Sequence, residues 1–278
     1  MTIEFNSIHT KDDLEHIGIL SKVDSPKDPE ECFLLIHGSS GNFYGAMNLA
    51  LIERFGEAGY DVASFNTRGH DLISRYGERF YGNAFDILSE CNYDLDAAIN
   101  FLTERGYKKI HLYGHSMGAV KVVYYGAKHP NPTITSIISS SPVRLSYDYF
   151  INHPDAVEEF TRCVNLANKH LENNEPDTLI DVQFPMPHTF GAKAYLDKHG
   201  SEKYNMTHYA QDIKIPTLLI AGTLETHPRL ENCATDTHEI MKSSHNKNSV
   251  VIVEGADHGW TDMHDEHAKE ILNWIASL

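Results

Sequence analysis

The sequence is poor in basic residues and has no long apolar run. Its 278 residues include 39 Asp and Glu against 23 Lys and Arg, which gives a net charge of −16. Nucleic-acid binding needs clustered Lys and Arg, and no such block is present. No apolar segment approaches the length of a membrane span, and Met1–Asn6 has neither the basic region nor the apolar core of a signal peptide. We therefore expect no nucleic-acid or membrane partner, and a cytoplasmic location.

Cysteine is scarce as well. The four cysteines lie far apart and lack the spacing of a metal or redox site, so reduced thiols are expected. Near the C-terminus, acidic and histidine side chains gather at Asp262, His264, Asp265 and His267. They fall on a predicted helix whose charged residues should face solvent, so the sequence predicts neither a metal nor another cofactor.

What the chain does have is a regular alternation of extended and helical segments, which is typical of a mostly parallel sheet with crossover helices. We predict strands over residues 2–8, 14–23, 32–36, 61–65, 109–113, 133–140, 217–221 and 249–253, and the first two should pair as a hairpin. Helical spacing covers residues 44–57, 86–105, 119–128 and 261–277.

One stretch interrupts this alternation. Between Pro142 and Pro216 the sequence contains no clear buried strand and includes a Pro-rich run at 184–187. A structureless loop of that length is improbable inside a domain. We therefore predict a mainly helical insertion over residues 143–213, with residues 1–142 and 214–278 forming the core.

The motif Gly114-His115-Ser116-Met117-Gly118 joins a predicted strand to a predicted helix. A serine in that context occupies a sharp, strained turn, and flanking glycines avoid clashes with the neighbouring strand and helix. The following helix N-terminus favours developing negative charge. Ser116 is thus the predicted nucleophile.

A serine nucleophile needs a base, and the base needs a group to orient it. His258 directly follows the last strand, and Glu225 follows the strand before it, so the chain order is serine, acid, histidine. Three other carboxylates are weighed against Glu225: Asp148, Asp257 and Glu254. Asp257 and Glu254 lie too close to His258 in the chain to face its ring, and Asp148 would require a long excursion.

The tetrahedral intermediate of acyl transfer also needs backbone N–H donors. The amide of Met117 directly follows the nucleophile, and the loop after residues 32–36 contains Gly38-Ser39-Ser40-Gly41. We predict that the amides of Ser39 and Met117 form the oxyanion hole.

These segments together resemble the α/β-hydrolase superfamily over nearly the whole chain, and in particular its carboxylesterase- and thioesterase-like members. The resemblance implies an eight-stranded sheet and an insertion that acts as a cap over Ser116. Glu225 departs from the Asp that is commoner at its position. Phe65–His70 resembles the superfamily's Arg-Gly turn, which we interpret as structural. Phe184, Met186 and Phe190 are candidate substrate-binding residues, or alternatively the insertion's own core.

The sequence therefore predicts a serine hydrolase that cleaves an ester or thioester of a small to medium-sized acyl substrate through an acyl-enzyme intermediate. A C–C bond hydrolase or an acyltransferase with the same triad is an alternative. A ligand receptor with little turnover is an alternative of another class. A homodimer is compatible with the sequence.

Overall fold

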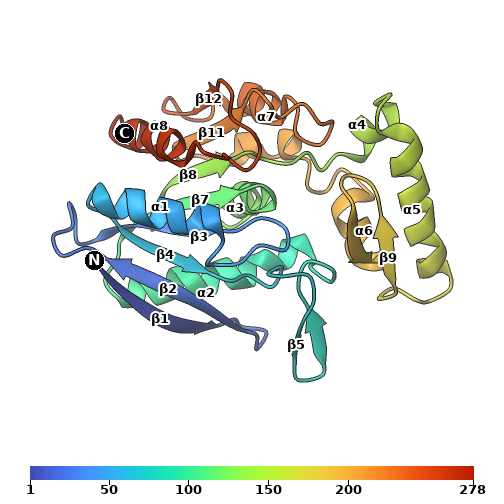
Figure 1. The fold of residues 1–278 in the computed structure, drawn as a ribbon, viewed down its shortest axis with the longest axis horizontal. Helices are drawn as coiled ribbons and strands as arrows, with labels where there is room; N and C mark the ends of the chain where they lie inside the picture. Colours follow the sequence, from blue (N-terminus) through green and yellow to red (C-terminus); the bar gives the residue numbers. More distant parts are fainter.

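The computed structural model describes residues 1–278, and an eight-stranded sheet forms its centre (Figure 1). The strands are β1 (Thr2–His9), β2 (Glu15–Lys22), β3 (Glu31–Ile36), β4 (Asp61–Phe65), β7 (Lys109–His115), β8 (Ile134–Ser140), β11 (Thr217–Gly222) and β12 (Ser249–Val253). They lie in the order β1-β2-β4-β3-β7-β8-β11-β12. β2 runs opposite to the other seven strands, and β1 pairs with it as an antiparallel hairpin. The mostly parallel sheet and each of its strands confirm the sequence prediction.

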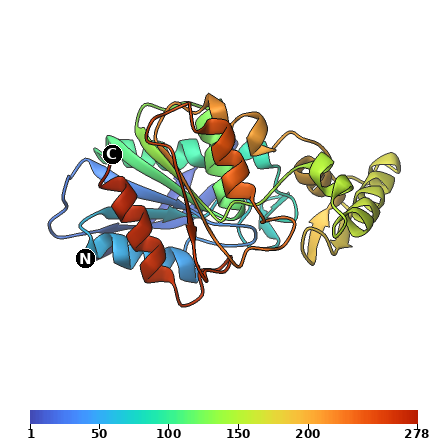
Figure 2. The same ribbon diagram turned by 90° about the horizontal axis from the view of Figure 1, so that it is seen from above.

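Helices cover both faces of this sheet (Figure 2). Because successive strand side chains point to opposite faces, the apolar run over residues 32–36 of β3 supplies both layers. Phe33 and Leu35 pack with α1 (Ala46–Glu57) and α8 (His264–Ile275). Cys32, Leu34 and Ile36 pack on the other face, whose helices are α2 (Cys91–Glu104), α3 (Met117–Lys128) and α7 (Cys233–Met241). The 3₁₀ turn Leu88–Glu90 precedes α2.

The insertion leaves the sheet after β8 and projects beyond it, at the right of Figure 1. It contains α4 (Tyr147–Asn152), α5 (Val157–Glu172), β9 (Leu179–Val182), β10 (His188–Gly191), α6 (Ala192–His199) and the 3₁₀ turns Met206–His208 and Ala210–Asp212. A separate cluster of 12 buried apolar residues, here called the insertion core, joins α4, α5, α6 and the β9–β10 hairpin. The residues from Tyr204 to Ile213 pack instead with the main core.

Ion pairs of Arg68 hold the Arg-Gly turn after β4 in place. Arg68 is only 2% exposed and its guanidinium contacts Asp94, Asp12 and Glu90. Asp94 also bonds His16 of β2 at 3.0 Å. The turn therefore fixes β2, β4 and α2 to one another, in a structural role. Two short strands, β5 (Ser74–Tyr76) and β6 (Arg79–Tyr81), form a hairpin beyond it.

No helix has both the length and the apolar character needed to cross a bilayer. The four cysteines are buried and unpaired. No three His, Cys, Asp or Glu side chains are arranged to hold a metal ion.

Candidate active site

Ser116 lies at the turn between β7 and α3 with φ 58° and ψ −119°, a left-handed conformation that is strained for serine. Its neighbours explain why the motif needs two glycines. A Cβ on Gly114 would approach the carbonyl oxygen of Gly118 to 2.2 Å, and one on Gly118 would approach that of Ile36 to 2.5 Å. The turn is therefore possible only with small residues on both sides of Ser116, as the motif predicts.

His258 is placed beside Ser116 by the loop that follows β12. Its Nε2 lies 3.0 Å from Ser116 Oγ, within hydrogen-bond length. The backbone of His258 is also held from the nucleophile's own strand, because His115 Nε2 donates to the carbonyl oxygen of His258 at 2.7 Å. Burial lowers the pKa of His115 to about 4, so this histidine is neutral near pH 7 and can serve as that donor.

Glu225 is the carboxylate that faces His258. Its Oε2 lies 3.6 Å from His258 Nδ1, an ion-pair contact slightly longer than a hydrogen bond. Both atoms are buried and neither has another hydrogen-bond partner. The other oxygen, Oε1, accepts from Ser141 Oγ at 2.5 Å and from the amide of Gly222 at 3.3 Å. The carboxylate is thus anchored through one oxygen, while the second oxygen faces only the histidine.

The support of Glu225 includes residues that the sequence reasoning missed. Ser141 has φ 48° and is fully buried. Its hydroxyl accepts from Trp260 Nε1 at 3.1 Å while donating to Glu225. Trp260 stacks on His267, with 4.0 Å between ring centroids. No local motif marks these residues, because strands and loops distant in sequence bring them together.

His267 corrects one expectation. It was predicted to face solvent from the final helix, but it is fully buried, with its Nε2 2.9 Å from Ser140 Oγ. Burial holds its pKa well below the usual histidine value, so the ring is neutral. Asp262 and Asp265 do face solvent.

The loop after β3 packs directly against the nucleophile. A Cβ on Gly38 would lie 2.9 Å from the Cβ of Ser116. His37 fixes the loop, since its Nδ1 donates to the carbonyl of Gly38 at 2.8 Å and its Nε2 accepts from the amide of Thr67 at 3.0 Å. Burial lowers the pKa of His37 to about 3, which keeps the acceptor nitrogen unprotonated. The amides of Ser39 and Met117 have no acceptor within the protein.

A cavity of about 290 Å³ opens over Ser116 and His258. Ser39 and Met186 line it, and Met186 is the part of the insertion that reaches it. Phe184 and Phe190 do not line it: both are buried in the insertion core. Their placement supports the interpretation that Phe184 and Phe190 belong to the insertion's own core and do not contact the substrate.

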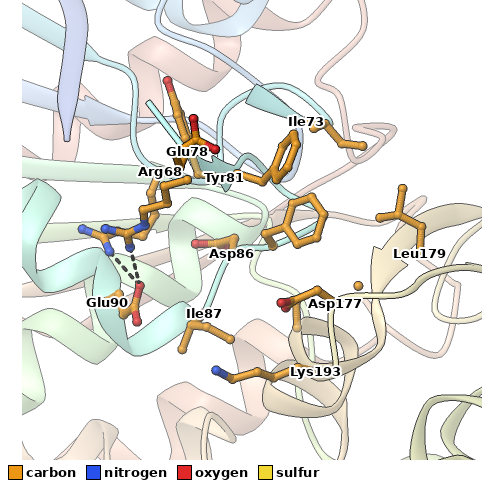
Figure 3. Close-up of a pocket in the computed structure, with 15 residues that line it drawn as sticks. Arg68, Ile73, Glu78, Tyr81, Asp86, Ile87, Glu90, Asp177, Leu179 and Lys193 are labelled. Atoms are coloured by element: carbon orange, nitrogen blue, oxygen red, sulfur yellow. Dashed lines mark hydrogen bonds and ion pairs between the residues drawn. The ribbon is translucent and has the colours of Figure 1, made fainter. Parts of the chain in front are cut away.

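A larger cavity, of about 660 Å³, lies between the β5–β6 hairpin and the insertion. Figure 3 shows Asp177, Leu179 and Lys193 of the insertion on one side of it and the paired Arg68 and Glu90 on the other. None of Ser116, Glu225 and His258 lines this cavity. The candidate active site is therefore the smaller cavity, which contains the nucleophile.

The model of the family described as serine aminopeptidase, S33, matches residues 27–185, more than half of the chain. The matched part contains the His37 loop and the Ser116 turn, whereas Glu225 and His258 lie beyond it. No curated protein matches the chain.

Solved structures resemble the chain over nearly its full length. The α/β-hydrolase GrgF from Penicillium sp. sh18 has a TM-score of 0.73 at 14% identity and covers 99% of this chain and 98% of its own. The Pyrococcus furiosus esterase Pf2001 has a TM-score of 0.67 at 19% identity, covering 99% and 91%. A thermostable carboxyl esterase from Bacillus coagulans has a TM-score of 0.72 at 13% identity, covering 100% and 99%. At these identities the likeness shows the α/β-hydrolase fold.

Proposed function

The chain belongs to the α/β-hydrolase superfamily, in the family described as serine aminopeptidase, S33, and we propose that it cleaves an ester or thioester through an acyl-enzyme on Ser116. The observation that carries this proposal is the 3.0 Å contact between Ser116 Oγ and His258 Nε2 at a strained turn facing a cavity.

The arrangement supports a specific sequence of steps. Ser116 Oγ attacks the substrate carbonyl while its proton passes to His258 Nε2, and the carboxylate of Glu225 stabilises the imidazolium. The oxyanion accepts hydrogen bonds from the amides of Ser39 and Met117. His258 then returns the proton to the leaving group, which departs as an alcohol or thiol. In the second half-reaction water, deprotonated by His258, attacks the acyl-enzyme. His258 then returns that proton to Ser116 Oγ as the carboxylic acid leaves.

The lining of the cavity favours esters over peptides with a free amino terminus. An aminopeptidase must bind the ammonium group of its substrate, and buried ammonium groups require an acidic partner. No Asp or Glu lines the cavity over Ser116. Its volume of about 290 Å³ is at the lower end for ligand pockets, which supports a small to medium-sized acyl substrate.

Labelling with a fluorophosphonate tests this proposal. The probe should modify wild type at Ser116 and leave Ser116→Ala unmodified, and turnover of the best substrate in a panel of esters, thioesters, lactones and amides should fall by about 10⁶ in the variant. Circular dichroism and thermal melting serve as the folding control. Labelling at a different serine, or unchanged turnover in Ser116→Ala, would refute the mechanism.

A further inference from the structure

Arg229 brings a positive charge to the wall of the active-site cavity. It lies in the loop that also contains Glu225, and it lines the same cavity as Ser116 and His258. Its Nη1 donates to the thioether sulfur of Met186 at 3.0 Å, and no other acceptor contacts its guanidinium. A thioether is a weak acceptor, so the guanidinium retains unused hydrogen-bonding capacity on the side of the cavity.

No carboxylate neutralises this arginine. No Asp or Glu side chain lies within ion-pair distance of Arg229. Among the other arginines only Arg105, which is exposed, also lacks a carboxylate partner. The remaining arginines each pair with a carboxylate: Arg54, Arg68, Arg75, Arg79, Arg144 and Arg162. Burial lowers the pKa of Arg229 from its ordinary value, and the nearby charge of Glu225 opposes that effect only in part. A partly buried cation without a partner is costly unless a ligand supplies the counter-charge.

The backbone that presents Arg229 is fixed in place. Its carbonyl accepts from the amide of Arg144 at 2.7 Å, and the side chain of Arg144 pairs with Asp236 of α7 at 2.6 Å. Arg144 also lies over the ring of Tyr149, 4.1 Å from its centroid. The loop is thus anchored to both α4 and α7, which positions the backbone of Arg229 before binding, and the contact with Met186 keeps its guanidinium at the cavity.

We propose that Arg229 binds a carboxylate of the substrate, so that the natural substrates are esters or thioesters carrying a second, anionic group. A carboxylate would replace the weak thioether contact with charge-assisted hydrogen bonds, for which the planar guanidinium is suited. The other lining side chains are neutral or histidine, so Arg229 is the one fixed cation available to that group. This inference rests on the proposed ester hydrolysis at Ser116.

Matched ester pairs test it. Mono-p-nitrophenyl glutarate and p-nitrophenyl valerate differ only in a terminal carboxylate on the acyl side. The acetates of 4-hydroxyphenylacetic acid and 4-ethylphenol place the same difference on the leaving group. Wild type should prefer the anionic member of at least one pair by on the order of tenfold to a hundredfold in kcat/KM. The same esters can compete with the fluorophosphonate for Ser116, which measures the preference by the extent of labelling and not by product formation.

Variants assign that preference to the guanidinium. Arg229→Gln should remove most of the preference by raising KM for the anionic ester, and Arg229→Lys should keep part of it. Arg105→Gln, an exposed arginine that also lacks a carboxylate partner, is the matched control and should keep the full ratio. If Arg229→Gln fails to fold, the wild-type ratio and Arg229→Lys decide the matter.

Two results overturn the inference: equal kcat/KM within both ester pairs for wild type, or equal losses on neutral and anionic esters in Arg229→Gln. In either case Ser116 would still react with the neutral probe. Failure of the proposed function would differ, because Ser116 would then be unlabelled and Ser116→Ala would keep its turnover.

Discussion

At the scale of single residues, the two oxygens of Glu225 have different contacts, and this difference bears on how the proposed base, His258, is held. One oxygen is occupied by Ser141 and the amide of Gly222, and the other faces His258 Nδ1 at 3.6 Å. Neutralising this carboxylate removes the charge that stabilises the imidazolium but leaves Ser116 and the backbone amides in place.

Glu225→Gln is therefore expected to lower kcat by roughly 10²–10⁴, less than Ser116→Ala. Asp257→Asn and Asp148→Asn are the controls, because Asp257 caps the amide of Thr261 at 2.9 Å and Asp148 is exposed on α4. Both should lose far less. Steady-state kinetics with one good ester suffices. A crippled Asp148→Asn beside a near-wild-type Glu225→Gln would show that the acid is on the wrong strand.

The site residues that sequence reasoning could find are those carried by local motifs. Ser116 is marked by the flanking Gly114 and Gly118. His258 and Glu225 each follow a strand that is recognisable from its apolar run. Ser141 and Arg229 gain their roles from neighbours distant in sequence, and no motif surrounds them in the chain. His115 lies within the Ser116 motif, but its bond to His258 depends on a residue distant in sequence. The sequence also could not predict which aromatic residues of the insertion lie in its own core and which line the cavity, since that depends on how its helices and strands pack.

At the scale of elements, tertiary contacts explain where the predicted boundaries moved. The helix expected from residue 86 begins at Cys91, because Asp86 is buried between Lys121 and Lys198, at 3.1 and 3.4 Å, and the amide of Leu88 donates to Asp197. The helix α7 was missed because its sequence, Cys233–Met241, is rich in Thr, Asp and His, which have modest helix propensity. The β9–β10 hairpin was missed because its strands are only 4 residues long.

The insertion core gives a second prediction. Phe190→Ala should destabilise the insertion by about 3 kcal/mol, the usual cost of removing a buried phenyl ring, while Met186→Ala should change the relative rates of different esters with little loss of stability. Hydrogen exchange of amides in α5 and α6 measures the first effect, and a substrate panel measures the second. Leu179→Ala, at a 44% exposed position of β9, is the stability control. Equal substrate effects from Phe190→Ala and Met186→Ala would argue against this separation.

At the scale of the whole molecule, several histidines are buried in their neutral form. Burial lowers the pKa values of His37 and His199 to about 3 and that of His115 to about 4, and it holds the pKa of His267 well below the usual value. In the unfolded chain these groups would titrate near pH 6.5. Between about pH 6.5 and pH 4 the unfolded state therefore binds more protons than the folded state, so stability falls as the pH is lowered through this window.

We expect the free energy of unfolding to be flat above about pH 7 and to fall below it, each buried histidine adding up to about 1.4 kcal/mol per pH unit. Urea denaturation between pH 7.5 and pH 4.5 measures this slope. His199→Phe should make the slope of stability against pH shallower, because it removes one buried histidine that titrates in the unfolded chain. Phenylalanine suits the site, since the His199 ring contacts Tyr195 and its buried Nδ1 has no hydrogen-bond partner. His208→Gln, at an exposed position, should leave the slope unchanged. An identical slope in wild type and His199→Phe would refute this account.

The insertion begins after β8 and ends before β11, and these two strands are neighbours in the sheet. Because β8 and β11 run parallel, the insertion forms part of the crossover from the carboxyl end of β8 to the amino end of β11. A segment of different length or sequence can replace it without changing the order of the strands, provided that it completes this crossover. Ser116, Glu225 and His258 all lie outside residues 143–213. A lineage with this architecture can exchange the insertion, and with it the wall that Met186 contributes to the cavity, while inheriting the proposed catalytic residues intact, so the two can evolve at different rates.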